Sequence, residues 1–536
     1  MSNINDFVIE NGELQKYKGQ GGDVVIPESV TSIGASAFWG CSSLTSVVIP
    51  ESVTSIGDWA FEGCKGLADA NGFVIIQNAL HDYYGKGGDV VIPEGVTSIG
   101  ASAFWECSSL ASVVIPEGVT SIGDKAFWGC SSLTSVVIPE GVTSIGDWAF
   151  YGCSSLASVV IPEGVTSIGT DAFNGCSSLT SVVIPASVTS ISDSAFYGCK
   201  GLADANGFVI FQNALHGYCG KGGDVVIPEG VTSIGAEAFR GCSSLTSVVI
   251  PKGVTGIGDS VFFNCSSLAS VVIPESVTSI GDWAFRGCIG LRSVVIPEGV
   301  TSINYRAFEG CKGLASVVIP EGVTSINDWA FYDCASLASI VIPEGVTSIG
   351  REAFAGCSSL ASVVIPESVT SIGDEAFSHC KSLTGVVIPE SVTSIGDEAF
   401  SYCKSLTGVV IPEGVKIIGK KAFAECDELC TIIAPSMPLQ YFIDEKLDVQ
   451  AACGFLSARE FYTDPDECEK YKKICMSKRK KLLAFIFKLD DAKALSFYID
   501  EKKVTAKNFD TDYFVPALQA GAEKCKALLL EWKEQH

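Results

Sequence analysis

Apolar residues recur along this chain at fixed intervals, and the pattern is clearest in the stretch LASVVIPEGVTSIGTDAFNGC, which ends at Cys176. Leu156, Val159 and Ile161 follow a strand-like spacing, which predicts a short β-strand with these side chains facing inward and Val160 facing outward. The proline after Ile161 ends the strand, because proline has no backbone N–H to donate. The first half of the stretch therefore predicts one half-buried strand.

The second half of the stretch continues the inward pattern with a different spacing. Val165 and Ile168 lie three residues apart after a Glu-Gly turn, and Ala172 and Phe173 then predict a short helical turn that Cys176 closes. In many copies an aspartate, such as Asp124 or Asp147, begins that turn. We expect this aspartate to cap the free amides at the start of the helical turn.

The whole unit is repeated. Near-copies end at Cys41, Cys64, Cys107, Cys130, Cys153, Cys176, Cys199, Cys242, Cys265, Cys288, Cys311, Cys334, Cys357, Cys380, Cys403 and Cys426. Within an unbroken block the cysteines are 23 residues apart. A fixed period in the twenties, with apolar residues at fixed phases, predicts a solenoid in which each coil packs only on its neighbours. One coil buries too few side chains to fold alone, so stability has to come from stacking.

Differences between the copies predict which backbone positions require a positive φ. The residue after Ile168 is Gly169, and its equivalents are Gly except Ser192, Asn304 and Asn327, so we expect a positive φ there. The residue before the cysteine is Gly in most copies but is Glu106 or Tyr402 in others. We therefore expect no requirement for positive φ at that second position.

Two insertions interrupt the array, and a different segment flanks it at each end. The segments 71–89 and 206–224 resemble each other and the N-terminus, with two apolar runs around a polar turn, and each predicts a β-hairpin. Residues 1–26 are then an N-terminal hairpin cap and residues 27–435 the solenoid. Residues 436–536 read as a small all-α module with a weak likeness to an ankyrin repeat over 517–532. This module either caps the last coil or also binds a partner.

Charge and cysteine content narrow the function classes. The net charge is −25, and because residues 436–536 hold equal numbers of basic and acidic residues, the imbalance lies in the array. An acidic array argues against nucleic-acid binding, and no apolar run is long enough for membrane insertion. No signal peptide is visible, so a cytoplasmic location and free buried thiols are expected, with the cell surface or secretion as the alternative.

The unit P-E-G-V-T-S-I-G-x-x-A-F-x-G-C-S-S-L resembles the BspA-like leucine-rich repeat family. In one coil the matching residues are Pro139, Val142, Ile145, Gly146, Ala149, Phe150, Gly152, Cys153 and Leu156. The resemblance covers residues ~5–435 and implies a β-rich α/β solenoid, a leucine-rich repeat array of 23-residue coils with short helical turns. It also implies that no catalytic residues carry over. Several members of the family are surface proteins that bind host matrix or other cells.

Three surfaces of the predicted array could contact a partner. The outward strand position is Val in all sixteen coils, which predicts either a binding stripe or simply a β-branched residue that suits strands. The residue after the strand-ending proline is usually Glu, which we interpret as a solvated face because one carboxylate ladder offers too few oxygens for Ca²⁺.

The outer turn varies most, and it is our choice for partner contact. Aromatic and basic residues enriched at interface hot spots follow the core Phe in nine coils: Trp39, Trp105, Trp128, Tyr151, Tyr197, Arg240, Phe263, Arg286 and Tyr332. The competing interpretation is that these side chains lie flat and pack on neighbouring coils.

The sequence therefore predicts a non-catalytic scaffold that binds a protein or a glycan, with no cofactor and no metal site. Two alternatives remain open: an adhesin exported by a non-obvious route, and a rigid spacer that displays the C-terminal helices. His216 and Cys219 lie three residues apart in the segment 206–224. The related segment 71–89 has Tyr84 in place of the cysteine, which disfavours a Cys-His nucleophile. The ligand and the oligomeric state are not predicted.

Overall fold

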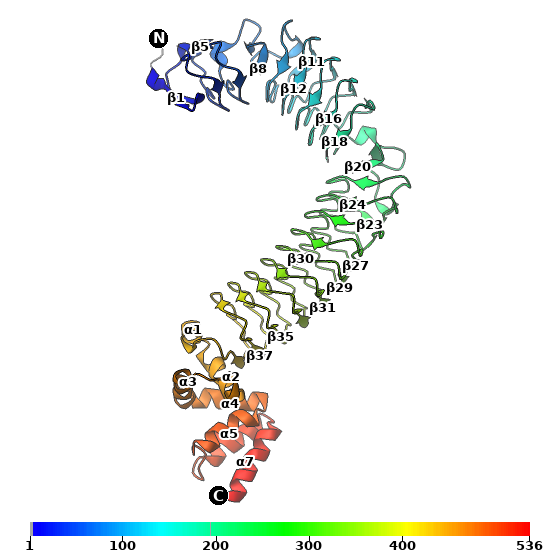
Figure 1. Ribbon diagram of the computed structural model, residues 1–536. Coiled ribbons are helices and arrows are strands. Elements are labelled where there is room, and N and C mark those ends of the chain that lie inside the picture. Colours follow the sequence, from blue (N-terminus) through cyan, green and yellow to red (C-terminus); the bar gives the residue numbers. More distant parts are fainter. Residues whose placement is uncertain (1–3, 193) are drawn as a thin grey trace. The chain divides into compact units, whose positions relative to one another are not determined.

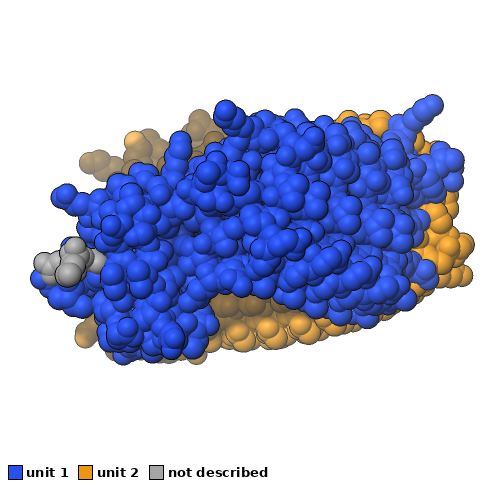
Figure 2. All heavy atoms as spheres, turned by 90° about the horizontal axis from the view of Figure 1, so that it is seen from above, with its two compact units in different colours: residues 1–221, 233–239 blue, residues 222–232, 240–536 orange. Residues whose placement is uncertain are grey.

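The computed structural model describes residues 4–192 and 194–536. The chain divides into two compact units, residues 1–221 with 233–239 and residues 222–232 with 240–536 (Figure 2). In each unit, successive coils are stacked one on the next (Figure 1).

Every coil contributes one strand to a parallel sheet on the strand face. In the first unit these strands are β3 (Gly22–Val25), β5 (Leu44–Val48), β9 (Gly88–Val91), β11 (Leu110–Val114), β13 (Ser135–Val137), β15 (Ser158–Val160) and β17 (Ser181–Val183). In the second they are β21 (Gly223–Val226), β23 (Leu245–Val249), β25 (Ser270–Val272), β27 (Ser293–Val295), β29 (Ser316–Val318), β31 (Ser339–Val341), β33 (Ser362–Val364), β35 (Gly385–Val387), β37 (Gly408–Val410) and β39 (Thr431–Ile433). Val159 pairs with Val182, one repeat later, so the sequence period is the register of the sheet.

Each coil also adds a second, two-residue parallel strand that the apolar pattern did not reveal as a strand. In the first unit these are β4 (Ser32–Ile33), β6 (Ser55–Ile56), β10 (Ser98–Ile99), β12 (Ser121–Ile122), β14 (Ser144–Ile145), β16 (Ser167–Ile168), β18 (Ser190–Ile191) and β22 (Ser233–Ile234). In the second they are β24 (Gly256–Ile257), β26 (Ser279–Ile280), β28 (Ser302–Ile303), β30 (Ser325–Ile326), β32 (Ser348–Ile349), β34 (Ser371–Ile372), β36 (Ser394–Ile395) and β38 (Ile417–Ile418). A two-residue strand is too short to show alternation along the chain.

The three related segments form antiparallel hairpins. They are β1 (Phe7–Glu10) with β2 (Glu13–Tyr17), β7 (Phe73–Ile76) with β8 (Ala79–Tyr83), and β19 (Phe208–Phe211) with β20 (Ala214–Tyr218). The later strand of each hairpin pairs in parallel with the two-residue strand that follows it, as Leu80 does with Ile99. Each hairpin thus begins a new run of the second sheet. Short 3-10 turns, Ile4–Asp6 (η1), Lys65–Leu67 (η2) and Lys200–Leu202 (η3), precede them.

The core of each unit is a set of ladders of identical side chains. Phe150 and Phe173 stack with ring centroids 5.2 Å apart and planes within 3°, and the same relation links most successive coils. Leu156, Val159 and Ile161 are buried, as the alternation predicted. Stacked rings and apolar rungs bury their surface only against the neighbouring coils, so no coil carries a complete core.

The repeated cysteines form a ladder of hydrogen bonds rather than disulfides. The Cys153 thiol donates to the Phe127 carbonyl, 26 residues earlier, at 3.2 Å, and eleven other copies repeat this bond at 3.0–3.3 Å. Burial raises the pKa of Cys153 to about 12. The expectation of buried thiols is therefore confirmed for these coils.

The outer turn does not form the regular helical turn that we expected. Trp148, Phe150 and Gly152 donate their backbone N–H groups to carbonyls of the next coil, at 2.7–2.8 Å. To aim alternate amides along the stack, Trp148 and Gly152 adopt the left-handed conformation, with φ of 55° and 70°. The expectation for the residue before the cysteine was wrong: φ is positive there in all sixteen coils, including Glu106 (53°) and Tyr402 (57°).

The predicted positive φ at Gly169 was also wrong, since this residue is not among those with positive φ. Its lack of a side chain has another cause. A Cβ on Gly169 would lie 2.6 Å from the backbone nitrogen of Asp147 in the preceding coil. Glycine is therefore selected by the close approach of two coils.

The aspartate that opens the outer turn acts between coils, not within one. The Asp147 carboxylate accepts the backbone N–H of Thr170 in the next coil at 2.7 Å, and Asp124 accepts that of Asp147 at 2.8 Å. Five further aspartates in the second unit make the same contact. The expected cap of a local helix is thus replaced by a bridge that ties adjacent coils together.

Helices follow the last coil of the second unit. They are α1 (Leu439–Asp444), α2 (Asp448–Ser457), α3 (Pro465–Ser477), α4 (Arg479–Leu489), α5 (Ala492–Asp500), α6 (Val515–Gln519) and α7 (Glu523–Gln535), with a 3-10 turn at Arg459–Phe461 (η4) and a π-helical turn at Phe509–Phe514 (η5).

Helix α2 packs directly on strand β39. A Cβ on Gly454 would lie 1.9 Å from the Ile432 carbonyl oxygen, and the Ala434 amide donates to the Tyr462 hydroxyl at 3.1 Å. The helical module therefore covers the end of the stack, which an exposed strand edge requires.

Candidate binding surfaces

The strand face carries an apolar stripe in each unit. The outward valines Val25, Val48, Val91, Val114, Val137, Val160 and Val183 line the first unit, and Val226, Val249, Val272, Val295, Val318, Val341, Val364, Val387 and Val410 line the second. All sixteen are exposed, with 39–74% of their surface accessible. The alternation predicted this orientation, because their backbone neighbours on each strand point into the core.

An apolar groove lies on this stripe in the second unit. It has a volume of about 590 Å³, and Val226, Val249 and Val272 line it together with Pro251 and Lys252. The glutamates that follow the strand-ending prolines flank the stripe and are exposed, as Glu298 and Glu321 are. Among the described residues no group of three or more His, Cys, Asp and Glu side chains is placed to hold a metal ion.

On the outer face of the first unit, three of the predicted contact residues stack on one another. The Trp105 and Trp128 rings lie 5.0 Å apart with planes within 4°, and Tyr151 follows at 4.1 Å. The sequence left open whether these rings face a partner or pack on neighbouring coils, and their stacking shows that they do pack on neighbouring coils, which does not decide whether they also face a partner.

Lys125, which sequence reasoning did not select, lies at the centre of a tryptophan cluster. Its Nζ is 5.2–5.9 Å from the ring centroids of Trp59, Trp105, Trp128 and Trp148. An ammonium over aromatic faces is stabilised by the ring quadrupoles. Lys125 stands at the position that is Trp59, Trp148, Trp283 and Trp329 in other coils, so a signal was present in the sequence: a cation at a position where four coils carry tryptophan.

Trp39 and Tyr197 differ from the stacked trio. Trp39 has 65% of its surface exposed, compared with 39% for Trp105. Tyr197 is half-buried, and its carbonyl accepts the Gly175 amide at 2.8 Å. Trp39 therefore offers the more accessible ring of the two.

In the second unit, cations and aromatic rings alternate along the outer face. The Arg240 and Arg286 guanidinium carbons both lie 5.0 Å from the Phe263 ring centroid. Arg286 Nε also lies 2.9 Å from Glu309 Oε2, and Arg306 Nη1 lies 3.4 Å from the same oxygen. The predicted residues Arg240, Phe263 and Arg286 therefore pack against one another, with both arginines over the Phe263 ring.

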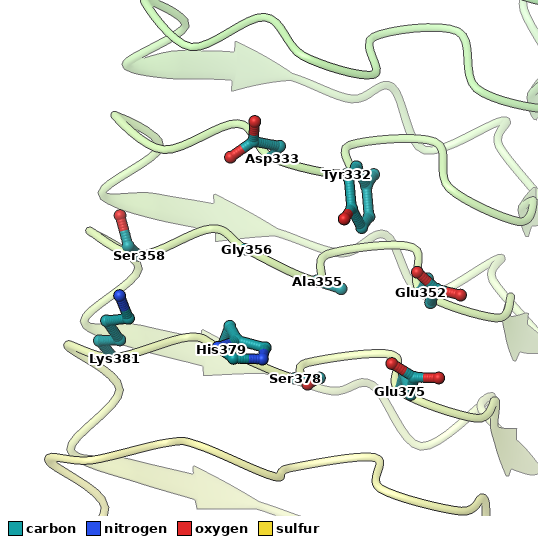
Figure 3. A pocket seen from close by; sticks show the side chains of 10 residues that line it. All are labelled: Tyr332, Asp333, Glu352, Ala355, Gly356, Ser358, Glu375, Ser378, His379 and Lys381. Carbon is teal, nitrogen blue, oxygen red and sulfur yellow. The ribbon is translucent and has the colours of Figure 1, made fainter.

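Tyr332, the last of the predicted contact residues, borders an open pocket. The pocket has a volume of about 410 Å³, and Tyr332, Ala355 and Ser378 occupy equivalent places on three successive coils (Figure 3). Glu352 and Glu375 lie along one side of it, and Asp333, His379 and Lys381 lie toward the other. Burial and four nearby carboxylates raise the pKa of Tyr332.

His216 is enclosed in the core and is not placed to act on a substrate. His216 is buried, its ring lies 5.9 Å from that of Phe211 and 6.1 Å from that of Phe196, and both ring nitrogens lack a hydrogen-bond partner. Burial lowers the pKa of His216, and that of His81 in the other insert, to about 4. A neutral imidazole enclosed by phenylalanines has no access to a substrate.

Within the described part of the chain, no helix is both long enough and apolar enough to cross a lipid bilayer.

Comparisons with known proteins agree with this architecture. The model of the BspA type leucine rich repeat region matches in six copies over residues 16–72, 74–203, 210–338 and 324–444. Comparison with curated protein sequences returns no match.

Several solved bacterial structures are similar. A leucine-rich repeat protein from Bacteroides ovatus is 29% identical over 72% of this chain and 94% of its own, with a TM-score of 0.43. One from Eubacterium ventriosum is 27% identical over 55% of this chain and 90% of its own, also at 0.43. A leucine rich cell surface protein from Faecalibacterium prausnitzii is 28% identical over 79% and 93%, at 0.29. With its repeats matched by the family model over most of its length, the chain belongs to the BspA-type leucine-rich repeat family.

Proposed function

We propose that this protein is a non-catalytic scaffold that binds another protein through the valine stripe of its strand face. The observation that carries the proposal is the exposure of the same apolar residue in every coil. Soluble proteins rarely leave a contiguous apolar patch this long uncovered unless it is a contact surface. The backbone groups of these strands are already paired between coils, so a partner meets side chains only.

The uniformity of the stripe indicates the kind of partner. Identical rungs one strand spacing apart suit a partner with its own repetitive apolar side chains, such as a β-rich or coiled protein surface. The exposed glutamates beside the stripe and the net charge of −25 favour a partner with basic residues at the rim of its contact. A glycan would also need aromatic platforms, and the stripe offers none, although exposed serines such as Ser158 lie beside it.

The test replaces three neighbouring valines by a residue of the same shape. Val295, Val318 and Val341 are changed to Thr, which retains β-branching but adds a hydroxyl to each rung. A second variant changes Glu298, Glu321 and Glu344 to Gln in the same coils, which should weaken binding by removing charge at the rim without ending it. Proteins bound by the wild type and, more weakly, by the glutamine variant, but lost by the threonine variant, support the proposal. Equal retention by all three proteins contradicts it.

We also propose a reducing, cytoplasmic location, supported by the thiol ladder of the core. Display at the cell surface is the alternative. Fractionation of source cells tests this: intact chain in the cytosolic fraction supports the proposal, and intact chain on the outer surface contradicts it.

A further inference from the structure

The pocket beside Tyr332 lies where an arginine side chain stands three coils earlier. Phe263, Arg286 and Glu309 follow one another along the outer face, and Tyr332, Ala355 and Ser378 stand at the same three positions three coils later. At the earlier site the Arg286 guanidinium lies 5.0 Å from the Phe263 ring centroid. At the later site alanine replaces the arginine, and the volume above it is open.

The walls of this pocket provide the same two kinds of group that hold Arg286, although Ser378 stands in place of Glu309 and the carboxylates come from other positions. Tyr332, with 36% of its surface exposed, provides an aromatic face in place of Phe263. Glu352 and Glu375 provide carboxylates from the neighbouring column, and Ala355 and Ser378 are small and form the floor. An aromatic face and a carboxylate together select a planar cation, which can stack and donate hydrogen bonds at once.

Arg351 of the same chain already contacts both glutamates, but their carboxylates can accept further hydrogen bonds. Arg351 Nε lies 3.2 Å from Glu352 Oε1, and its Nη2 lies 3.8 Å from Glu375 Oε1. Each carboxylate has two oxygens and several lone pairs. Glu309 shows that one carboxylate in this face forms ion pairs with two guanidinium groups, since its Oε2 lies 2.9 Å from Arg286 Nε and 3.4 Å from Arg306 Nη1.

From this correspondence we infer that the pocket formed by Tyr332, Ala355, Glu352 and Glu375 binds an arginine side chain of a partner protein. The inserted guanidinium stacks on Tyr332 and forms ion pairs with the glutamates, as Arg286 stacks on Phe263 and pairs with Glu309. The excess negative charge of the array favours the approach of a basic segment. The site lies on the outer face, so it is separate from the valine stripe and stands or falls independently of the proposed function.

A peptide titration tests the inference on the full chain. The probe is an acetylated and amidated Gly-Ser peptide with one central arginine, and the matched peptides carry citrulline or lysine at that position. The readout is the ¹³C chemical shift of the δ carbon of the central residue, which all three peptides contain and which can be followed with every variant of the chain. We expect a saturable shift with the arginine peptide below about 10 mM and a much smaller one with citrulline, which has the same shape without the charge.

Two variants separate the pocket from general charge attraction. Glu375→Gln should weaken binding about tenfold, which is the effect of one charge-assisted hydrogen bond. Ala355→Arg fills the pocket with the chain's own guanidinium and should abolish binding. Asn174→Arg is the matched control, because it places the same charge at the same position of the outer turn in the first unit.

Three results would overturn the inference. One is equal shifts with the arginine and citrulline peptides. Another is an equal loss of binding in Asn174→Arg and Ala355→Arg. The third is that spermidine competes as well as the arginine peptide, since a flexible amine then suffices and a planar guanidinium on a protein is not the ligand.

Discussion

Trp105 and Trp128 stand one repeat apart in the sequence, and their rings stack face to face with centroids 5.0 Å apart. Lys125 lies 5.6 and 5.9 Å from the two centroids. Residues that look like interface anchors in the sequence therefore also join adjacent coils, while Trp105 keeps 39% of its surface exposed.

Replacing the middle ring of this stack should weaken the first unit. Trp128→Ala removes contacts to Trp105, Tyr151 and Lys125, and we expect the free energy of unfolding to fall by about 2 kcal/mol in urea denaturation. Trp39→Ala is the control, because its ring is mostly exposed and should cost less than about 0.5 kcal/mol. Equal losses in the two variants would contradict a structural role for the stack.

Stability should decrease in mild acid because of the hairpin histidines. The folded-state pKa of His81 and His216 is about 4, below the ordinary value of 6.5, so the unfolded chain binds more protons between those limits. The stability that these groups contribute is thus fully present above pH 6.5 and is lost as pH falls toward 4, by up to about 1.4 kcal/mol per pH unit for each histidine.

The measurement is the free energy of unfolding across that pH range for the wild type and for His216→Leu. The variant should lose part of the pH dependence. His379→Leu is the control, since it removes a histidine from the exposed outer turn and not from a hairpin. Parallel curves for the wild type and His216→Leu would refute the linkage.

The close approach of coils at Gly169 predicts a sharp difference between two glycines. Gly169→Ala places a Cβ 2.6 Å from the Asp147 nitrogen and should cost more than about 2 kcal/mol. Gly118→Ala is the matched change, because its Cβ would lie 3.4 Å from its nearest neighbour and its φ is not positive. Thermal unfolding of both variants checks this, and a similar Tm for the two would show that the coils can separate locally.

The thiols of the core should resist alkylation in the folded protein. Cys153 is buried and its pKa is raised to about 12, so little thiolate forms at neutral pH. Cys219 and Cys468 are half-exposed and should react faster with iodoacetamide. Mass spectrometry of digests taken over time measures the order. Labelling of Cys153 as fast as Cys468 would show that the stack opens on that timescale.

The solenoid and its core could be predicted from the sequence because the period is visible along the chain. Leu156, Val159 and Phe173 are buried where the apolar phases placed them. The backbone of the outer turn could not be predicted, since Gly169 is required by contact with another coil and Glu106 adopts positive φ to aim an amide at the next carbonyl. Such requirements arise between coils, which a single repeat does not show.

The candidate binding surfaces also include features that the sequence could predict and features that it could not. The outward valines followed from alternation, whereas the stacking of Trp105 on Trp128 depended on side-chain directions that the pattern leaves open. The pocket beside Tyr332 exists because Ala355 is small in a column that holds bulky residues in several other coils. A small residue draws little attention in a sequence, although comparing equivalent positions three coils apart, such as Arg286 and Ala355, could have revealed the pocket.

The registry of Val159 on Val182 and of Cys153 on the Phe127 carbonyl has a genetic consequence. Since every rung meets a chemically equal rung, an in-frame loss or gain of one coil within an unbroken block joins surfaces that already match. Array length can drift through unequal recombination while folding is preserved, and selection then acts on the few side chains that make one turn different from the next.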